Sequence, residues 1–456
     1  MRNLEKNYEN LLVLFLISHF FLWASYFNKI IDIRFLIIIL PFILFNKFNR
    51  NLLRGNLNIY YLSSFLIIII HYVYSSKILN IDIKSITILK ILLLFTLAFI
   101  IKQNIHIIES NFNKFINFSL YTLFFLISFE MILHLINSNF FFFKFSNLSN
   151  CYDGYFRRFS KIFLEESHYG MVVPSLIITS TIINFEKKFL VNFLLTQLLI
   201  IFSIFYALSL TFILSIILGS IIAILLIRDN KIKIYFTFII LVILFFAKSN
   251  VNCAHKFFNI TYSLSKNFNN KIITSFLETQ NNSYFNKKKL IENDRIKELK
   301  HSNSNINKNE EPHIELSSIV YLKAINNLRL TLQNQFFGFG FDNYQFAFEK
   351  YNDKSSKNIN KSYYKDWVIK SLNKNDGSNN SIKLFVEFGL FSLFFYVLIT
   401  LFFFNKNIKS IFRLFFINLI ITQLFIRGAG YFNGGFIVSF LVLTFIHFKN
   451  LDEKNI

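Results

Sequence analysis

The sequence predicts an all-α polytopic membrane protein of about twelve transmembrane helices, with one large extracytoplasmic loop before the last three spans. The composition is 54% hydrophobic, includes 63 Phe and has a mean hydropathy of +0.46, which is far more apolar than an ordinary soluble domain. The apolar residues occur in runs close to the roughly 20 residues that cross a bilayer. Lysine and arginine gather in alternate connections between these runs, as they do in cytoplasmic loops.

The first apolar run is predicted to be a retained span and not a removable signal peptide. Tyr26, Phe27, Asn28 and Lys29 end it, where a signal peptide would carry small residues for cleavage. The candidate spans centre on Leu11–Phe27, Ile30–Phe45, Ile59–Tyr74, Ile83–Ile101, Phe115–Ile136, Gly170–Ile183, Phe189–Ala207, Leu210–Ile227, Ile234–Ala247, Ile382–Phe404, Ser410–Ile426 and Gly434–Phe448.

The distribution of basic residues predicts that both chain ends are cytoplasmic. The connections on the opposite side are poorer in charge, and the short ones hold only Lys29 and Lys77 as bases. The basic residues of the predicted cytoplasmic segments are Lys47, Arg50, Arg54, Lys102, Lys114, Lys187, Lys188, Arg228, Lys231, Lys233, Lys406, Lys409, Arg413, Lys449 and Lys454.

Three regions follow from this topology. Residues 1–247 form a membrane bundle of nine spans with an outer loop at 137–161, residues 248–380 form the large outer loop, and residues 381–456 carry the last three spans. Within the large loop, Leu316–Leu332 has helical apolar spacing and is predicted to lie on the membrane or on the protein core. Cys151 and Cys253 both fall outside, where either a disulfide or two free thiols is compatible with the sequence.

The net charge of +22 does not indicate a nucleic-acid-binding protein, because the basic residues are scattered among apolar runs. Arg157–Gly170 holds two Arg, one Lys, two Glu and one His directly before an apolar run. If it is helical from Arg158, then Arg158, Lys161, Glu165 and His168 share one face and offer cations, a proton acceptor and a proton donor. The alternative is a solvated helix entrance with internal ion pairs.

Three further clusters are candidate sites. Gly338 and Gly340 permit a tight turn before Asp342, for ligand contact or simply to lead into a surface helix. Asn375–Phe395 places polar residues at a span entrance, with Lys383 and Glu387 one helical turn apart, either facing a wet cavity or forming a structural ion pair. The last cluster, Arg427–Phe436, holds four glycines and is either part of the site or a plain turn.

These clusters, in this order, resemble the O-antigen polymerase and ligase superfamily of bacterial envelope glycan assembly. Its pattern is an Arg before a Phe-(x)-Glu-Pro-Ser element, a large outer loop that ends in Gly-x-Gly, and an Asn before an (x)-Glu-(x)-Gly-Leu span. The matching residues here, in chain order, are Arg158, Phe163, Glu165, Ser167, Gly338, Gly340, Asn380, Glu387, Gly389 and Leu390. The resemblance covers roughly Arg157 to Phe395.

The resemblance implies a glycosyltransferase of the bacterial inner membrane that joins undecaprenyl-diphosphate-linked oligosaccharide repeat units, with its large loop in the periplasm. It implies no cofactor and no metal, and it suggests a chain-length regulator and a flippase as pathway partners. Glu165, His168 and Arg158 become the candidate catalytic residues. The candidate substrate-binding residues are Arg157, Lys161, Arg329, Gly338, Gly340, Asn380 and Arg427.

The sequence departs from the family pattern at three places. Glu166 stands where Pro is frequent, and Asn379 stands where many ligase-type members have His. The basic residue expected ahead of Gly-x-Gly is either Arg329 or Lys323. The missing His and the Glu-(x)-Ser-His form of the first motif favour a polymerase over an O-antigen ligase, which transfers glycan to the lipid A core and is the nearest alternative. A polysaccharide flippase is a further alternative, but the sequence shows no repeated halves.

Overall fold

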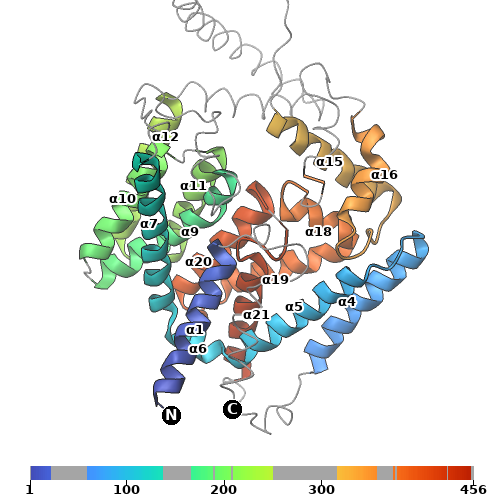
Figure 1. Ribbon diagram of the computed structural model, residues 1–456, viewed down its shortest axis with the longest axis horizontal. Helices are drawn as coiled ribbons and strands as arrows, with labels where there is room; N and C mark the ends of the chain where they lie inside the picture. Colours follow the sequence, from blue (N-terminus) through green and yellow to red (C-terminus); the bar gives the residue numbers. More distant parts are fainter. Residues whose placement is uncertain are drawn as a thin grey trace, which may run out of the picture.

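The computed structural model describes residues 2–21, 59–136, 166–187, 190–206, 209–249, 316–356, 373–374, 377–428 and 430–452, and no strand occurs among them. The first helices are α1 (Arg2–Phe21), α4 (Ile59–Ile78), α5 (Ser85–Gln103), α6 (Ile105–Ser110), α7 (Phe112–Ile136), α9 (Glu166–Lys187), α10 (Leu190–Tyr206), α11 (Leu210–Leu226) and α12 (Asn230–Ser249) (Figure 1). The later elements are α15 (Leu316–Asn334), α16 (Tyr344–Ser356), α18 (Asn380–Phe388), η4 (Gly389–Ser392), α19 (Leu393–Phe404), α20 (Ser410–Ile421), η5 (Thr422–Ile426) and α21 (Phe436–Asp452).

The predicted spans are largely helical where the structure describes them, although Ile382–Phe404 is broken at Gly389 and the last helix begins at Phe436. The second predicted span, Ile30–Phe45, lies outside the described residues, as does the end of the first span after Phe21. By length and composition, 3 helices are able to cross a membrane, namely Ser85–Gln103, His168–Phe185 and Asn380–Phe404. Shorter apolar helices are Leu66–Ile78, Leu190–Ser203, Leu210–Leu226, Ser410–Ile426 and Phe436–Lys449.

Helix α9 is the centre of the bundle. Of its segment His168–Phe185, 94% is buried, compared with 33% for Ser85–Gln103. Its polar side chains bond to neighbouring helices, because an apolar interior offers them no water. These bonds join Tyr169 to Ser203 on α10 (2.7 Å), Ser180 to Thr196 on α10 (3.0 Å) and Ser175 to Asn418 on α20 (3.1 Å).

Small residues let α9 and α11 approach closely. A Cβ added to Gly170 would lie 2.6 Å from the backbone nitrogen of Phe212, and one added to Gly219 would lie 2.5 Å from the Ile178 side chain. Residues 170 and 178 of α9 therefore lie beside residues 212 and 219 of α11, so the two helices run parallel. Glycine contacts of this kind are typical of membrane helix packing.

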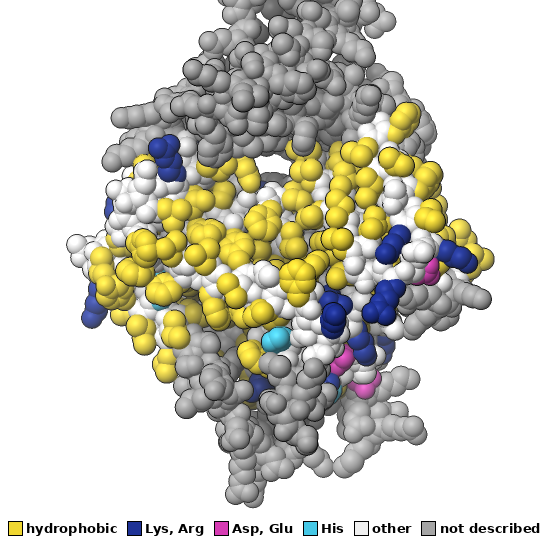
Figure 2. Space-filling view, turned by 180° about the vertical axis from the view of Figure 1, so that it is seen from behind, with side chains coloured by type: hydrophobic (Ala, Val, Ile, Leu, Met, Phe, Trp, Pro, Cys, Tyr) yellow, Lys and Arg dark blue, Asp and Glu magenta, His cyan; other side chains and the backbone are white. Residues whose placement is uncertain are grey.

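The outer surface of the bundle is apolar. Figure 2 shows a broad band of apolar side chains with lysine and arginine at its margins. Exposed large side chains include Ile67 on α4, Leu190 on α10, Ile234 on α12 and Phe404 on α19. A band of this extent is far larger than the patches that soluble monomers expose, and it is compatible with a membrane protein.

The beginning of α1 and the end of α21 lie at the same end of the molecule (Figure 1). Tyr8 donates a hydrogen bond to Asn104 just before α6 (2.9 Å). Glu109 on α6 pairs with Lys449 on α21 (2.9 Å) and with Lys409 before α20 (3.7 Å). Connections that the charge pattern assigns to the cytoplasm are therefore in contact with one another.

Helices α15 and α16 belong to the region predicted as the large outer loop, and they pack against α18. The predicted helix at Leu316–Leu332 is confirmed as α15, which lies on the protein core. Leu322 and Ala324 of its apolar face are buried, while Leu332 is exposed. The second core between these helices contains Ala324, Phe339, Tyr344, Ala347, Phe348, Tyr351, Ile382 and Val386.

Candidate functional site

The site is built around a break in the candidate span Asn380–Phe404. Helix α18 ends at Phe388, and Gly389 takes φ +56° with ψ −136° before η4 and α19 continue the span. Glycine is the residue that adopts this conformation at no steric cost. The break leaves carbonyl groups at the end of α18 without their usual helical donors.

The Gly-x-Gly turn supplies those donors. Phe339 N–H donates to Val386 O (2.9 Å), and Gly340 N–H donates to Glu387 O (2.8 Å). In return, Phe336 O accepts from Leu390 N–H (3.2 Å). Two clusters that are about 50 residues apart in the chain therefore pair backbone to backbone.

Gly338 and Gly340 take positive φ values of +77° and +90°, so the turn needs their conformational freedom. A Cβ added to Gly338 would lie 2.5 Å from Glu387 O, which is too close for any real side chain. The close approach of the turn to α18 is thus a direct consequence of the glycine at position 338. These glycines shape the backbone of the turn, and they are not themselves evidence of contact with a ligand.

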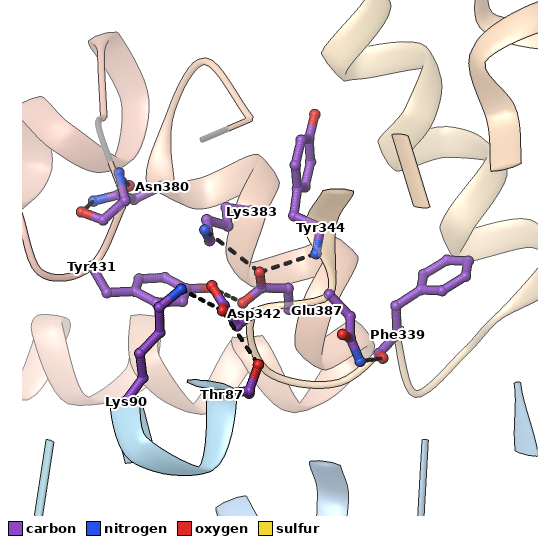
Figure 3. Close-up of polar contacts among 11 residues, drawn as sticks. Thr87, Lys90, Phe339, Asp342, Tyr344, Asn380, Lys383, Glu387 and Tyr431 are labelled. Carbon is purple, nitrogen blue, oxygen red and sulfur yellow. Dashed lines mark hydrogen bonds and ion pairs between the residues drawn. The ribbon is translucent and has the colours of Figure 1, made fainter. Parts of the chain in front are cut away.

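Glu387 is fully buried beneath this turn (Figure 3). Its carboxylate accepts a hydrogen bond from the Tyr431 hydroxyl (2.7 Å) and one from Tyr344 N–H (3.3 Å). Lys383 Nζ lies 3.7 Å from the same carboxylate and 5.1 Å from the centre of the Tyr431 ring. The Lys383–Glu387 pair expected from the sequence is therefore formed, and it is buried. A buried carboxylate needs this many partners, because burial without them is strongly unfavourable.

Tyr431 remains the donor in this cluster. Its burial, together with the nearby Glu387 carboxylate, raises the pKa of the Tyr431 hydroxyl well above its ordinary value. The phenol therefore stays protonated at neutral pH and can donate to Glu387. Phe341 stacks on the Tyr431 ring at a centroid distance of 5.7 Å, so the turn also fixes the ring by packing.

Asp342 ties the same turn to α5. It has φ +61°, an uncommon conformation for a residue with a side chain. Its carboxylate lies 2.5 Å from Lys90 Nζ and accepts a longer bond from the Thr87 hydroxyl (3.4 Å). Both partners point toward Asp342 from one face of α5 (Figure 3). The pair is partly exposed, so it is accessible from outside the core.

The polar entrance of α18 joins the Arg427–Phe436 cluster. The buried Asn380 side chain accepts from Gly430 N–H (3.1 Å), and Gly428 N–H donates to Ser378 O (3.1 Å). The Arg427 guanidinium donates to Ser378 O (3.1 Å) and reaches the side-chain oxygen of Asn373 (3.5 Å). The residue beside Asn380, Asn379, caps α18 by accepting from Ile382 N–H (2.8 Å).

The structure thus brings together four of the predicted site residues, namely Gly338, Gly340, Asn380 and Arg427, around α18. His168 is buried in the first turn of α9, a helix that also contacts η5, the segment before Arg427. Arg329 lies on the exposed face of α15. Its alternative, Lys323, is buried with its Nζ 4.1 Å from the centre of the Phe348 ring. The predicted residues outside the described part of the chain are Arg157, Arg158, Lys161, Glu165, Cys151 and Cys253.

The predicted site residues did not include Lys90, Asp342, Lys383, Glu387 or Tyr431, although all of these except Lys90 lie within the candidate clusters. Lys90 carried a signal, because a lysine inside the apolar run ITILKILLLF is costly unless it has a partner. Tyr431 carried no such signal, because aromatic residues make up 19% of the chain and a single tyrosine does not stand out among them. Only the fold shows that its hydroxyl reaches Glu387.

The described part of the cluster combines three cationic side chains, Lys90, Lys383 and Arg427, with the carboxylates of Asp342 and Glu387. Such a set can bind an anion or transfer a proton at the end of a candidate membrane helix. Among the described residues, no group of three His, Cys, Asp or Glu side chains is arranged to hold a metal ion. Comparison with protein-family models, with curated proteins and with solved structures finds no match for the chain.

Proposed function

We propose that the chain is a membrane glycosyltransferase that polymerises undecaprenyl-diphosphate-linked oligosaccharide repeat units at the outer face of the bacterial inner membrane. The observation that carries the proposal is the meeting of two motifs of the resemblance, Gly-x-Gly and the element from Asn380 to Leu390, at the break in Asn380–Phe404. The Gly-x-Gly turn bonds to the end of α18, and the Arg427 loop bonds to its entrance. If the motif matches were accidental, there would be no reason for the matched residues to lie next to one another in the structure.

In the proposed reaction, a hydroxyl oxygen of one repeat unit forms a bond to the anomeric carbon of the growing chain. The bond from that carbon to the diphosphate oxygen breaks, and the lipid diphosphate leaves with the electron pair. The acceptor proton passes to Glu165 or His168, and the cations Arg158, Arg329 and Arg427 stabilise the leaving diphosphate. Arg157 and Lys161 add positive charge for the same anion.

The proposed topology has twelve spans with both ends in the cytoplasm and residues 248–380 in the periplasm. Two features support it. The connections predicted to be cytoplasmic meet at Glu109, which pairs with Lys409 and Lys449. Helices α9 and α11 run parallel, as alternate spans of a membrane bundle must.

The test is the glycan that cells make when the gene is deleted. Loss of a polymerase leaves lipid A core with a single repeat unit, whereas loss of a ligase leaves core with none. Loss of a flippase also leaves none, and it causes lipid-linked repeats to accumulate in the inner leaflet. A normal ladder of long chains in the deletion strain would contradict the proposal.

Complementation then tests the catalytic residues. We expect Glu165→Gln or Arg158→Ala to abolish chain elongation, because the first removes the base and the second a phosphate-binding cation. Glu349→Gln is the matched control and should restore the ladder, because Glu349 is an exposed carboxylate on α16 that contacts Lys374 and Gln345. Long chains from the Glu165 or Arg158 variant, at normal membrane levels of the protein, would reject the assigned roles.

A further inference from the structure

The turn Gln335–Gly340 exposes two aromatic side chains although it belongs to the segment predicted to lie outside the membrane. Phe336 is 57% exposed and Phe337 is 48% exposed, while Phe339 and Phe341 in the same stretch are buried. The two exposed rings contact each other at a centroid distance of 5.3 Å. An exposed aromatic pair marks a surface that meets an apolar partner more often than it meets water.

This pair is continuous with the apolar face of the candidate span Asn380–Phe404. The Phe337 ring stacks on Phe391 at 5.5 Å with an interplanar angle of 26°. Phe391 is itself exposed, and the same exposed face continues along α19 through Leu393, Phe394, Val397, Leu401 and Phe404. A membrane that covers α19 therefore reaches Phe337 over a nearly continuous apolar face, on which the exposed Thr400 hydroxyl donates to Tyr396 O within the helix.

The turn is also held by α4. His71 forms a hydrogen bond with Phe337 O (2.8 Å), and its ring stacks on Phe388 at 5.3 Å. Helix α4 exposes Leu66, Ile67 and Ile70. The turn is thus bounded by two helices that both present apolar side chains to the outside.

Most of the backbone groups of the turn are hydrogen-bonded to protein atoms, which is what membrane depth favours. Hydrocarbon has no hydrogen-bonding groups, so non-helical backbone survives at membrane depth only when protein atoms satisfy it. The break at Gly389 is satisfied by Phe339 N–H and Gly340 N–H, and Leu390 N–H is satisfied by Phe336 O. Val386 and Glu387 are buried in the protein, so this pairing is compatible with a position at membrane depth.

We propose that the turn Gln335–Gly340 is inserted into the outer edge of the bilayer, with Phe336 and Phe337 in contact with lipid acyl chains. The insertion brings the Gly-x-Gly element and the cluster at Glu387 to the membrane surface. The exposed polar residues Gln333 and Asn334 at the end of α15 mark the boundary with water. This inference rests on the membrane location in the proposed function, and it does not depend on glycosyl transfer.

Fluorescence quenching by lipids with brominated acyl chains tests the insertion. The two native tryptophans, Trp23 and Trp367, are first replaced by Phe, and Phe337→Trp is introduced as the only reporter. The full-length protein is reconstituted in phosphatidylcholine vesicles brominated either near the headgroup or deep in the chain. We expect strong quenching of the reporter at position 337, and stronger quenching by the shallow bromines than by the deep ones.

Two reporters make the outcome decisive. Phe394→Trp, on the exposed face of α19, should be quenched more by the deep bromines, and Glu349→Trp, on exposed α16, should remain unquenched. Quenching at position 337 as low as that at position 349 would overturn the inference while leaving the span intact. If position 394 also escaped quenching, the membrane location itself would be wrong, and the insertion would be rejected with it.

Discussion

At the scale of single residues, the most consequential group is the Glu387 carboxylate, because it is fully buried and joins three segments of the chain. Lys383 lies on its own helix, Tyr344 begins α16, and Tyr431 belongs to the connection before α21. A charged group removed from water is stable only while its partners remain. Removing any one of these partners is therefore expected to destabilise the folded protein, because the buried carboxylate then keeps fewer hydrogen bonds.

We expect Tyr431→Phe to destabilise the protein by about 1–3 kcal/mol, because it deletes one hydrogen bond to a buried charge. Thermal unfolding of the detergent-solubilised protein measures the loss. The matched control is Tyr396→Phe, which loses only the bond to the neutral Ser381 hydroxyl at a half-buried site. Equal destabilisation by the two variants would show that Glu387 does not depend on Tyr431.

The pH dependence of stability gives a second readout of the same residue. The folded state raises the pKa of Tyr431, so the neutral phenol is favoured by folding. The Tyr431 hydroxyl makes its full contribution to stability at a pH below its unfolded pKa of about 10. This contribution is lost as the pH rises above that value. The alkaline loss of stability should therefore be smaller in Tyr431→Phe than in the parent protein.

At the scale of elements, the break between α18 and α19 decides the shape of the site. A continuous helix would carry Glu387 past the Gly-x-Gly turn and leave no carbonyl group for Phe339 and Gly340 to bind. Gly389 permits the break because it adopts φ +56°. The turn and the break are thus one structural unit, formed from two distant parts of the chain.

Two glycine variants test this unit. Gly430→Ala places a Cβ 4.0 Å from its nearest atom, Lys383 Nζ, so it should cost only the left-handed strain of about 1–2 kcal/mol. Gly389→Ala has a comparable positive φ, but its Cβ would overlap Phe336 O and lie 2.7 Å from Gly338 N. We therefore expect a clearly larger loss of thermal stability for Gly389→Ala. Similar losses for the two variants would mean that the turn is free to move away from the break.

At the scale of the whole molecule, the two ends of the bundle differ in chemistry. One end gathers α6, the start of α20 and the end of α21 through Glu109 and its lysine partners. The site at α18, α15 and α16 occupies another part of the molecule, beside the turn that connects α4 to α5 (Figure 1). If the chain spans the inner membrane as proposed, these two regions face opposite compartments.

Cysteine labelling in intact spheroplasts measures this arrangement. In a chain with Cys151 and Cys253 replaced by Ser, we expect Lys77→Cys to react with a membrane-impermeant maleimide. Lys406→Cys should react only after the membrane is permeabilised, since both side chains are exposed but lie on opposite predicted sides. Labelling of position 406 in intact spheroplasts would reverse or reject the proposed topology.

Much of the helical framework was predictable from the sequence, because apolar runs of span length have few alternatives to a helix. The amphipathic spacing likewise predicted α15, and the spacing of four residues predicted the Lys383–Glu387 pair. The site was less predictable. Nothing local indicates that Asp342 binds Lys90 or that Tyr431 binds Glu387, since these partners are separated by 252 and 44 residues.

The sequence by itself determined a helical, strongly apolar chain with polar clusters at particular helix ends, since periodicity and hydropathy depend only on neighbours in the chain. The order and spacing of these polar clusters also gave the resemblance to a known family. Only the tertiary structure decided that the Gly-x-Gly turn completes the broken helix, that Asn380 and Arg427 share its entrance, and that Glu387 is buried between them. The physical reason is that backbone donors and a buried charge are satisfied by whichever groups the fold brings within reach, and chain distance does not specify those groups.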